Sequence, residues 1–140
     1  MMNPNLRLVL RSLAATPFRL LFAYAGIILL LHLDVSPLPA WTLDALQYLL
    51  QFTTMFLAAW WVMQRRAATW KQAALVYAVL VVFGVMLEIG LAVLISGPAP
   101  GLLTQLVAMR SLVLYVVYAI GVSCGYLQAE RGEKKLEAGI

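Results

Sequence analysis

Two charged residues inside long apolar segments are the residues of this sequence most able to do chemistry. Glu88 lies in the segment from Trp70 to Ile95, and Arg110 lies in the next, from Leu102 to Leu127. A charged side chain at the centre of a membrane helix costs about 2.5–3.5 kcal/mol on insertion scales, so it is rarely accidental. A carboxylate tuned by a neighbouring cation can hold a proton, an ion or a polar headgroup.

The positions of Glu88 and Arg110 predict that their side chains meet. An antiparallel hairpin that reverses around Ala99 places both residues about 14–17 Å along the helices from the turn, at about 1.5 Å per residue. That distance corresponds to the middle of a hydrocarbon layer about 30 Å thick. We therefore expect a Glu88–Arg110 ion pair.

A stripe of polar residues on the second apolar segment is expected to join this pair. Steps of three and four residues place one set on a single helix face, namely Asp44, Gln47, Gln51, Thr54, Ala58, Trp61 and Arg65. Gln51 and Tyr24 fall at nearly the depth of the pair. The sequence thus predicts one polar layer made of Glu88, Arg110 and Gln51, with Gln47, Thr54 and Tyr24 as further members.

Two interpretations of this layer stay open. In the structural one, the ion pair and its amide neighbours fix the register of the helices. In the functional one, the layer is a site for a proton, an ion or a polar headgroup, with Glu88 as the titratable group and Arg110 as the partner that tunes it. A general acid or base needs a His, a Cys or a second carboxylate at the same depth, and none is present, so we do not expect an enzyme. His32 stands alone, so neither a metal nor a cofactor is expected.

The elements that carry these residues are predicted to be membrane helices. Of the 140 residues, 64% are apolar and only 11% are charged, against about 45–50% and about 25% in soluble domains. Four segments approach the roughly 20 residues that cross a bilayer, at about 18–33, 41–63, 70–95 and 102–127. We expect an all-α membrane protein, a four-transmembrane-helix antiparallel bundle with both termini on the cytoplasmic side.

Three regions are expected along the chain. Residues 1–16 predict a short cytoplasmic amphipathic helix that a turn at Thr16–Pro17 leads into the membrane. Residues 17–129 form the transmembrane domain, and residues 130–140 a charged cytoplasmic tail.

The basic residues predict the orientation, because Lys and Arg are enriched in cytoplasmic loops. They cluster before the first segment, between the second and third, and after the fourth: Arg7, Arg11, Arg19, Arg65, Arg66, Lys71, Arg131, Lys134 and Lys135. This distribution favours a bacterial inner-membrane protein with both termini in the cytoplasm. Although the net charge is +4, these short clusters do not form the basic face of a nucleic-acid-binding protein.

Small residues predict where helices approach closely. Gly121 and Gly125 form a Gly-x-x-x-Gly pattern, which lets two helix backbones come together. Because this face also points toward the polar layer, we expect the contact inside the bundle rather than with a second copy. Gly84, one turn before Glu88, permits tight packing beside the charge.

No sequence motif names an activity. The first hypothesis is a non-enzymatic binding or accessory module, such as a partner subunit, an assembly factor or an immunity-type protein. The alternative is a small oligomeric transporter or channel for a proton, an ion or a small polar solute that uses Glu88. The expected partners are the lipid bilayer and either another membrane protein or further copies of the chain.

Overall fold

The computed structural model describes residues 2–33, 38–64, 68–97 and 109–139, which form four helices and no strands. The helices are α1 (Pro4–His32), α2 (Ala40–Met63), α3 (Trp70–Ser96) and α5 (Met109–Glu137). The all-α fold is confirmed, and α2 and α3 match the expected segments within one residue. The start of the fourth segment and the side chain of Arg110 lie outside the described part of the chain.

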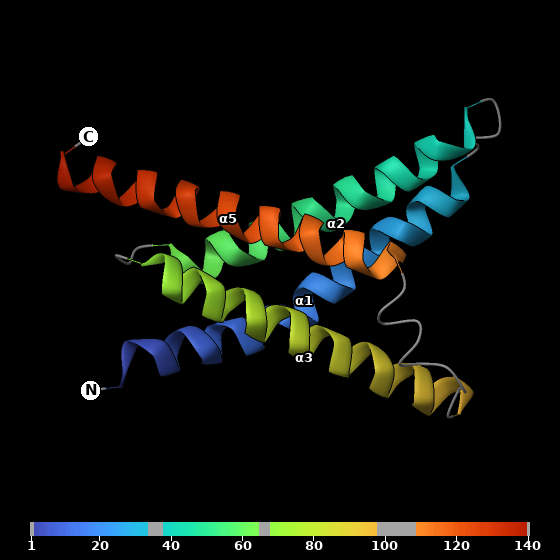
Figure 1. The fold of residues 1–140 in the computed structure, drawn as a ribbon, viewed down its shortest axis with the longest axis horizontal. Coiled ribbons are helices and arrows are strands. Elements are labelled where there is room, and N and C mark those ends of the chain that lie inside the picture. The colour runs from blue at the N-terminus through green and yellow to red at the C-terminus, as the bar shows by residue number, and fades with distance from the viewer. Residues whose placement is uncertain (1, 34–37, 65–67, 98–108, 140) are drawn as a thin grey trace.

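The four helices form a bundle in which successive helices run in opposite directions and both termini lie at the same end (Figure 1). Around the bundle, α1 contacts α2 and α3, and α5 contacts the same two helices, with the α2–α5 contact the most extensive. As a result α1 runs parallel to α3, and α2 runs parallel to α5. We call the half that contains the termini the proximal half, and the other the distal half.

Three of the four helices are long and apolar enough to cross a membrane: α1, α3 and α5. Helix α2 does not meet this criterion, so its crossing of the membrane stays a prediction. With 24 residues, α2 is about 36 Å long and could span the hydrocarbon layer. Its Asp44, Gln47 and Gln51 lower the hydropathy of its apolar stretch.

Helix α1 also differs from expectation, because it does not turn at Thr16–Pro17. It is one helix of 29 residues with Pro17 inside it, and Figure 1 shows a change of direction near its middle. Proline removes one backbone N–H, which kinks a helix without ending it where neighbouring groups compensate. The Thr16 hydroxyl donates to the Ser12 carbonyl at 2.8 Å at this bend. Helix α5 likewise continues to Glu137, so most of the expected tail is helical.

The two parallel helices α1 and α3 are joined where they begin. Thr69 and Gln72 form a capping box at the start of α3, in which each side chain bonds the backbone of the other residue. The Gln72 amide also donates to the Asn5 side chain at 3.1 Å, and the Asn3 side chain caps α1. These bonds satisfy N–H groups that a helix start leaves unpaired, and they set the register of α1 against α3.

Buried side chains are confined to the proximal half of the described residues. They lie between Leu8 and Ala23 on α1, Thr54 and Met63 on α2, Ala73 and Gly84 on α3, and Tyr118 and Ala129 on α5. In the distal half the α1–α2 hairpin and α3 diverge (Figure 1). The packed core therefore ends at the level of Thr54, Gly84 and Tyr118.

The glycines of α5 lie against the backbone of α2. A Cβ on Gly121 would stand 3.1 Å from the Phe52 carbonyl oxygen, and a Cβ on Gly125 would stand 2.9 Å from Phe56 O and from Trp60 N. The Gly-x-x-x-Gly pattern thus makes its contact inside the chain. Backbone atoms cannot move aside as a flexible side chain can, so this interface depends on the missing Cβ atoms.

We predict that Gly125→Ala lowers the free energy of unfolding by about 1–3 kcal/mol, the usual cost of overpacking a tight interface. Gly90→Ala is the control, because a Cβ on Gly90 meets nothing within 4 Å. Reversible unfolding in mixed micelles measures both. Equal stabilities of the two variants would contradict the packing described here.

Candidate functional site: a buried polar layer

Arg19 is the most buried charged residue that the structure describes. We expected it at the cytoplasmic edge before the first span, and that expectation is wrong: only 4% of Arg19 is exposed. Its guanidinium lies over the Tyr118 ring, 5.1 Å from the ring centroid. A Cβ on Gly84 would stand 3.0 Å from Arg19 Nη2, so the absence of a side chain at Gly84 makes room for the cation. The arginine thereby connects α1 with α3 and α5.

The Tyr118 hydroxyl extends this contact to the fourth helix by donating to Gln51 Oε1 on α2 at 3.2 Å. One turn further along α2, the buried Thr54 hydroxyl donates to the Gln51 carbonyl oxygen at 3.0 Å. Arg19, Tyr118 and Gln51 therefore form a chain of contacts across all four helices. A cation over an aromatic face contributes about 2 kcal/mol or more when the pair is desolvated.

Glu88 lies beside this chain, one helical turn beyond Gly84 on α3. It is partly buried and interacts electrostatically with Arg19. No hydrogen bond or salt bridge of Glu88 is seen within the described residues, so its interaction with Arg19 acts at longer range. The expected Glu88–Arg110 pair stays a prediction, since the Arg110 side chain lies outside the described residues.

Arg19 keeps unused hydrogen-bonding capacity in its buried position. Its Nε and Nη1 have no hydrogen-bond partner, and the Ser12 hydroxyl, two turns earlier on the same face of α1, also has none. A buried donor without a partner costs about 1–3 kcal/mol. Buried water molecules usually satisfy such groups, because each makes about three hydrogen bonds to polar atoms.

The other residues expected in the layer lie at its distal edge. Tyr24 is about half exposed but within electrostatic range of Glu88 and Arg19. Gln47, one turn before Gln51, makes no hydrogen bond within the described chain. The His32 ring shares a hydrogen bond of 2.8 Å with the Ile28 carbonyl at the end of α1. No three His, Cys, Asp or Glu residues of the described segments gather to form a metal site.

Sequence reasoning missed Arg19 and Tyr118, although one signal was available for the arginine. Ser12, Thr16, Arg19 and Ala23 follow steps of four, three and four residues, which is the spacing of one helix face. Three of the four are polar, so this face belongs inside the bundle and not at its edge. Tyr118 carried no such signal, because tyrosine is common both in cores and at membrane interfaces.

The arrangement brings polar groups of different kinds together inside the bundle. It combines one buried cation, one nearby carboxylate, two phenols and one amide, all within a low-dielectric bundle. No nucleophile paired with a base is formed among the described residues, and such a pair is what covalent catalysis requires. No known protein family matches the sequence, and neither a curated protein nor a solved structure is significantly similar to it.

We predict that Tyr118→Phe and Gln51→Leu are coupled, because either change removes the same hydrogen bond while the ring under Arg19 remains. A double-mutant cycle on unfolding in micelles should give a coupling of about 0.6 kcal/mol, the average for hydrogen bonds between membrane helices. Tyr115→Phe combined with Gln51→Leu serves as the control and should be additive. Additivity of the Tyr118 pair would disprove the contact.

Proposed function

We propose that the chain is a multi-pass protein of the bacterial inner membrane, with four crossings and both termini in the cytoplasm. We propose further that it acts there as a non-enzymatic binding module for another membrane protein, as a partner subunit, an assembly factor or an immunity-type protein.

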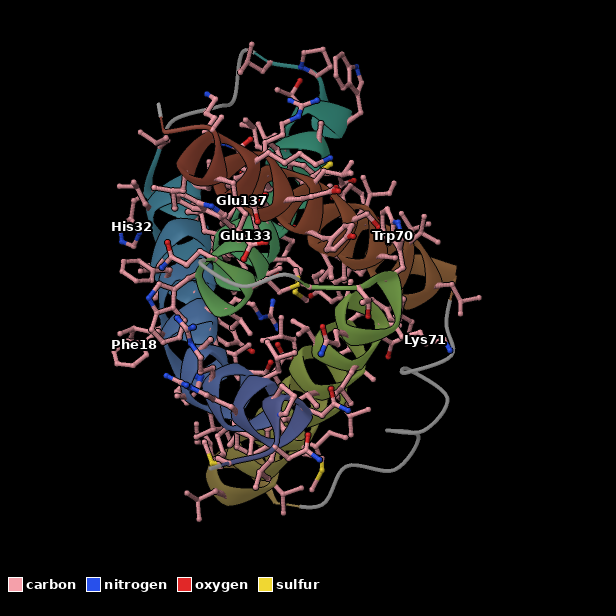
Figure 2. All side chains as sticks on the ribbon, turned by 90° about the vertical axis from the view of Figure 1, so that its left-hand side faces the viewer. Phe18, His32, Trp70, Lys71, Glu133 and Glu137 are labelled. Carbon is pink, nitrogen blue, oxygen red and sulfur yellow. The ribbon has the colours of Figure 1, made fainter. Side chains whose placement is uncertain are left out.

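The charge distribution supports this orientation. Arg7, Lys71, Arg131, Lys134 and Lys135 are exposed and lie on the proximal half, where both termini lie (Figure 1). Lys and Arg near the ends of membrane helices favour the cytoplasmic side. Figure 2, viewed from this end, shows Lys71 pointing away from the bundle and Trp70 beside α5. The Trp70 ring lies 4.4 Å from that of Tyr126, and such aromatic residues gather at membrane interfaces.

The contacts of α2 support its being the fourth crossing despite its lower hydropathy. Gln51 bonds Tyr118, and Thr54 bonds the Gln51 backbone, so these polar groups are satisfied inside the bundle. A polar group costs little in a membrane when its hydrogen bonds are made within the protein.

We predict that single cysteines at Pro39 and Ala68 react with a membrane-impermeant maleimide from opposite sides of the membrane. The variants are made in a Cys124→Ala background, which removes the natural thiol. In intact cells only Pro39→Cys should be labelled, and Ala68→Cys should react only after lysis. Ala138→Cys is the control for the C-terminus and should behave like Ala68→Cys. Labelling of the first two from the same side would show that α2 does not cross.

The unequal burial of the two halves carries the binding proposal. The core fills the proximal half, whereas the distal half of α3 exposes an apolar surface that includes Met86 at 63%, Leu94 at 82% and Ile95 at 80%. Glu88 borders this surface. A membrane carboxylate is most stable facing a cation or a polar group. A transmembrane helix of a partner, with a cationic or hydrogen-bonding residue at that depth, would fit both the apolar surface and the charge.

We predict that a photo-crosslinking residue at Leu91 or Leu94 gives one heterologous adduct in the native membrane, and that Glu88→Gln weakens it several-fold. The same residue at Ala74, an exposed position on the proximal half of α3, is the control and should give none. An adduct with a second copy of the chain, together with proton or cation flux in proteoliposomes that Glu88→Gln abolishes, would contradict the proposal. It would favour the small oligomeric transporter, for which Glu88 in the polar layer is the supporting observation.

A further inference from the structure

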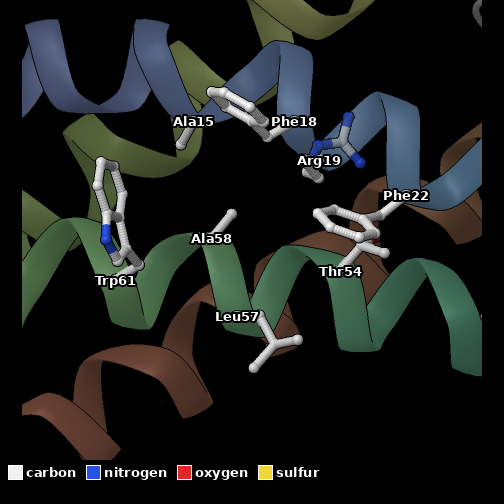
Figure 3. A pocket seen from close by; sticks show the side chains of 8 residues that line it. All are labelled: Ala15, Phe18, Arg19, Phe22, Thr54, Leu57, Ala58 and Trp61. Atoms are coloured by element: carbon white, nitrogen blue, oxygen red, sulfur yellow. The ribbon is translucent and has the colours of Figure 1, made fainter.

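A narrow apolar slot opens between α1 and α2 on the proximal half, away from the α3 surface discussed above. Its volume is about 280 Å³, and its wall is almost entirely apolar. Figure 3 shows the side chains of α1 facing those of α2, with Trp61 at one end and Phe22 at the other. The full lining is Ala15, Phe18, Arg19, Phe22, Thr54, Leu57, Ala58 and Trp61.

The slot is open toward the surroundings of the bundle. Phe18 and Phe22, on one side of it, are 66% and 67% exposed, and Figure 2 shows Phe18 projecting outward from α1. Two alanines, Ala15 and Ala58, leave the space between the two helices unfilled. In a membrane this space faces acyl chains, so its natural occupant comes from the lipid.

The chemistry of the wall shows which part of a lipid fits inside. Arg19 lines the slot, but its Nε and Nη1 are covered by protein, so they offer no site for a headgroup there. Trp61 and Thr54 are seven residues apart on α2, which corresponds to about 10 Å along the helix. That length falls within one leaflet, about half of a 30 Å hydrocarbon layer. One acyl chain satisfies both the length and the apolar lining.

The end of the slot at Trp61 carries positive charge. The Arg11 guanidinium lies over the Trp61 ring, 4.8 Å from its centroid, and Arg11 Nη2 donates to the Trp61 carbonyl oxygen at 2.9 Å. This bond neutralises part of the negative end of the α2 dipole and fixes the cation at the mouth of the slot. Arg7 lies one turn earlier on α1 and is exposed. Arg11 against this tryptophan, with a second cation one turn away on the same helix, attracts an anionic headgroup.

We propose that this slot is a specific site for an anionic phospholipid of the cytoplasmic leaflet. One acyl chain occupies the slot from Trp61 to Phe22, and the phosphate of the headgroup lies beside Arg11 and Arg7. This site uses a different face of the bundle from the binding function above, and its assignment to the cytoplasmic leaflet rests on the orientation proposed there.

The test uses the full chain purified in detergent and offered phosphatidylglycerol or phosphatidylcholine, with native mass spectrometry counting the bound lipid. Phosphatidylglycerol should bind about fivefold more tightly for each cation that its phosphate approaches. Arg7→Gln should reduce this preference about fivefold, whereas Arg7→Lys should retain it. Equal binding of both lipids to the unmodified chain would overturn the proposal that Arg11 and Arg7 recognise an anionic headgroup.

A substitution that fills the slot tests whether an acyl chain occupies it. Ala58→Phe should abolish the retained lipid, whereas Ala45→Phe, at an exposed position on α2 outside the slot, should leave it unchanged. A second measurement compares quenching by brominated phosphatidylglycerol between the unmodified chain and Trp61→Phe. The chain has four tryptophans, so if each were quenched equally, the loss of Trp61 would remove one quarter of the quenched fluorescence. We expect Trp61→Phe to remove more than one quarter. Unchanged lipid binding in Ala58→Phe, or quenching spread equally over the tryptophans, would overturn the slot.

Discussion

The burial of one guanidinium inside an apolar bundle is the constraint on which the centre of this structure depends. Arg19 is 4% exposed, and a buried charge is tolerated only where its surroundings compensate for lost water. Here the compensation comes from two helices, α3 and α5. Gly84 yields space on α3, the Tyr118 ring of α5 presents its negative face, and Glu88 supplies an opposite charge at longer range. Each of these partners is held at the depth of the arginine, so the cation fixes the register of the bundle.

The same layer divides the molecule into two halves with different properties. On the proximal side, glycine contacts between α2 and α5 and large side chains such as Met55 and Val76 form a close-packed core. On the distal side the helices diverge, and no described residue is buried. Packed cores resist deformation, whereas loosely packed regions accept partners at low cost. The layer therefore marks the boundary between the packed part and the loosely packed part of the described chain.

The sequence predicted the helices well because hydropathy and helix breakers act locally, and both signals are strong around α2 and α3. The polar layer at the centre of the bundle was predicted less well. Its composition depends on which faces of helices far apart in the sequence pack together. Arg19 was assigned to the cytoplasmic edge since Pro17 was expected to start the helix there. Once α1 continues through Pro17, Arg19 lies two turns deeper than Arg11. Gln51 and Thr54 were found, because a polar stripe on an apolar helix identifies the buried face whatever its partner.

Helix α2 shows how the polar residues of a largely apolar helix can be satisfied by its neighbours. Hydropathy treats every polar residue as exposed to lipid, whereas Gln51 and Thr54 of α2 make their hydrogen bonds inside the protein. The same residues that lower its hydropathy therefore stabilise it once α5 is present, through Tyr118 and the glycine contact. It follows that α2 depends on its neighbours in a way that the apolar α3 does not. Its stability comes from assembly of the bundle, and the contacts of Gln51 and Tyr118 help to make that assembly specific.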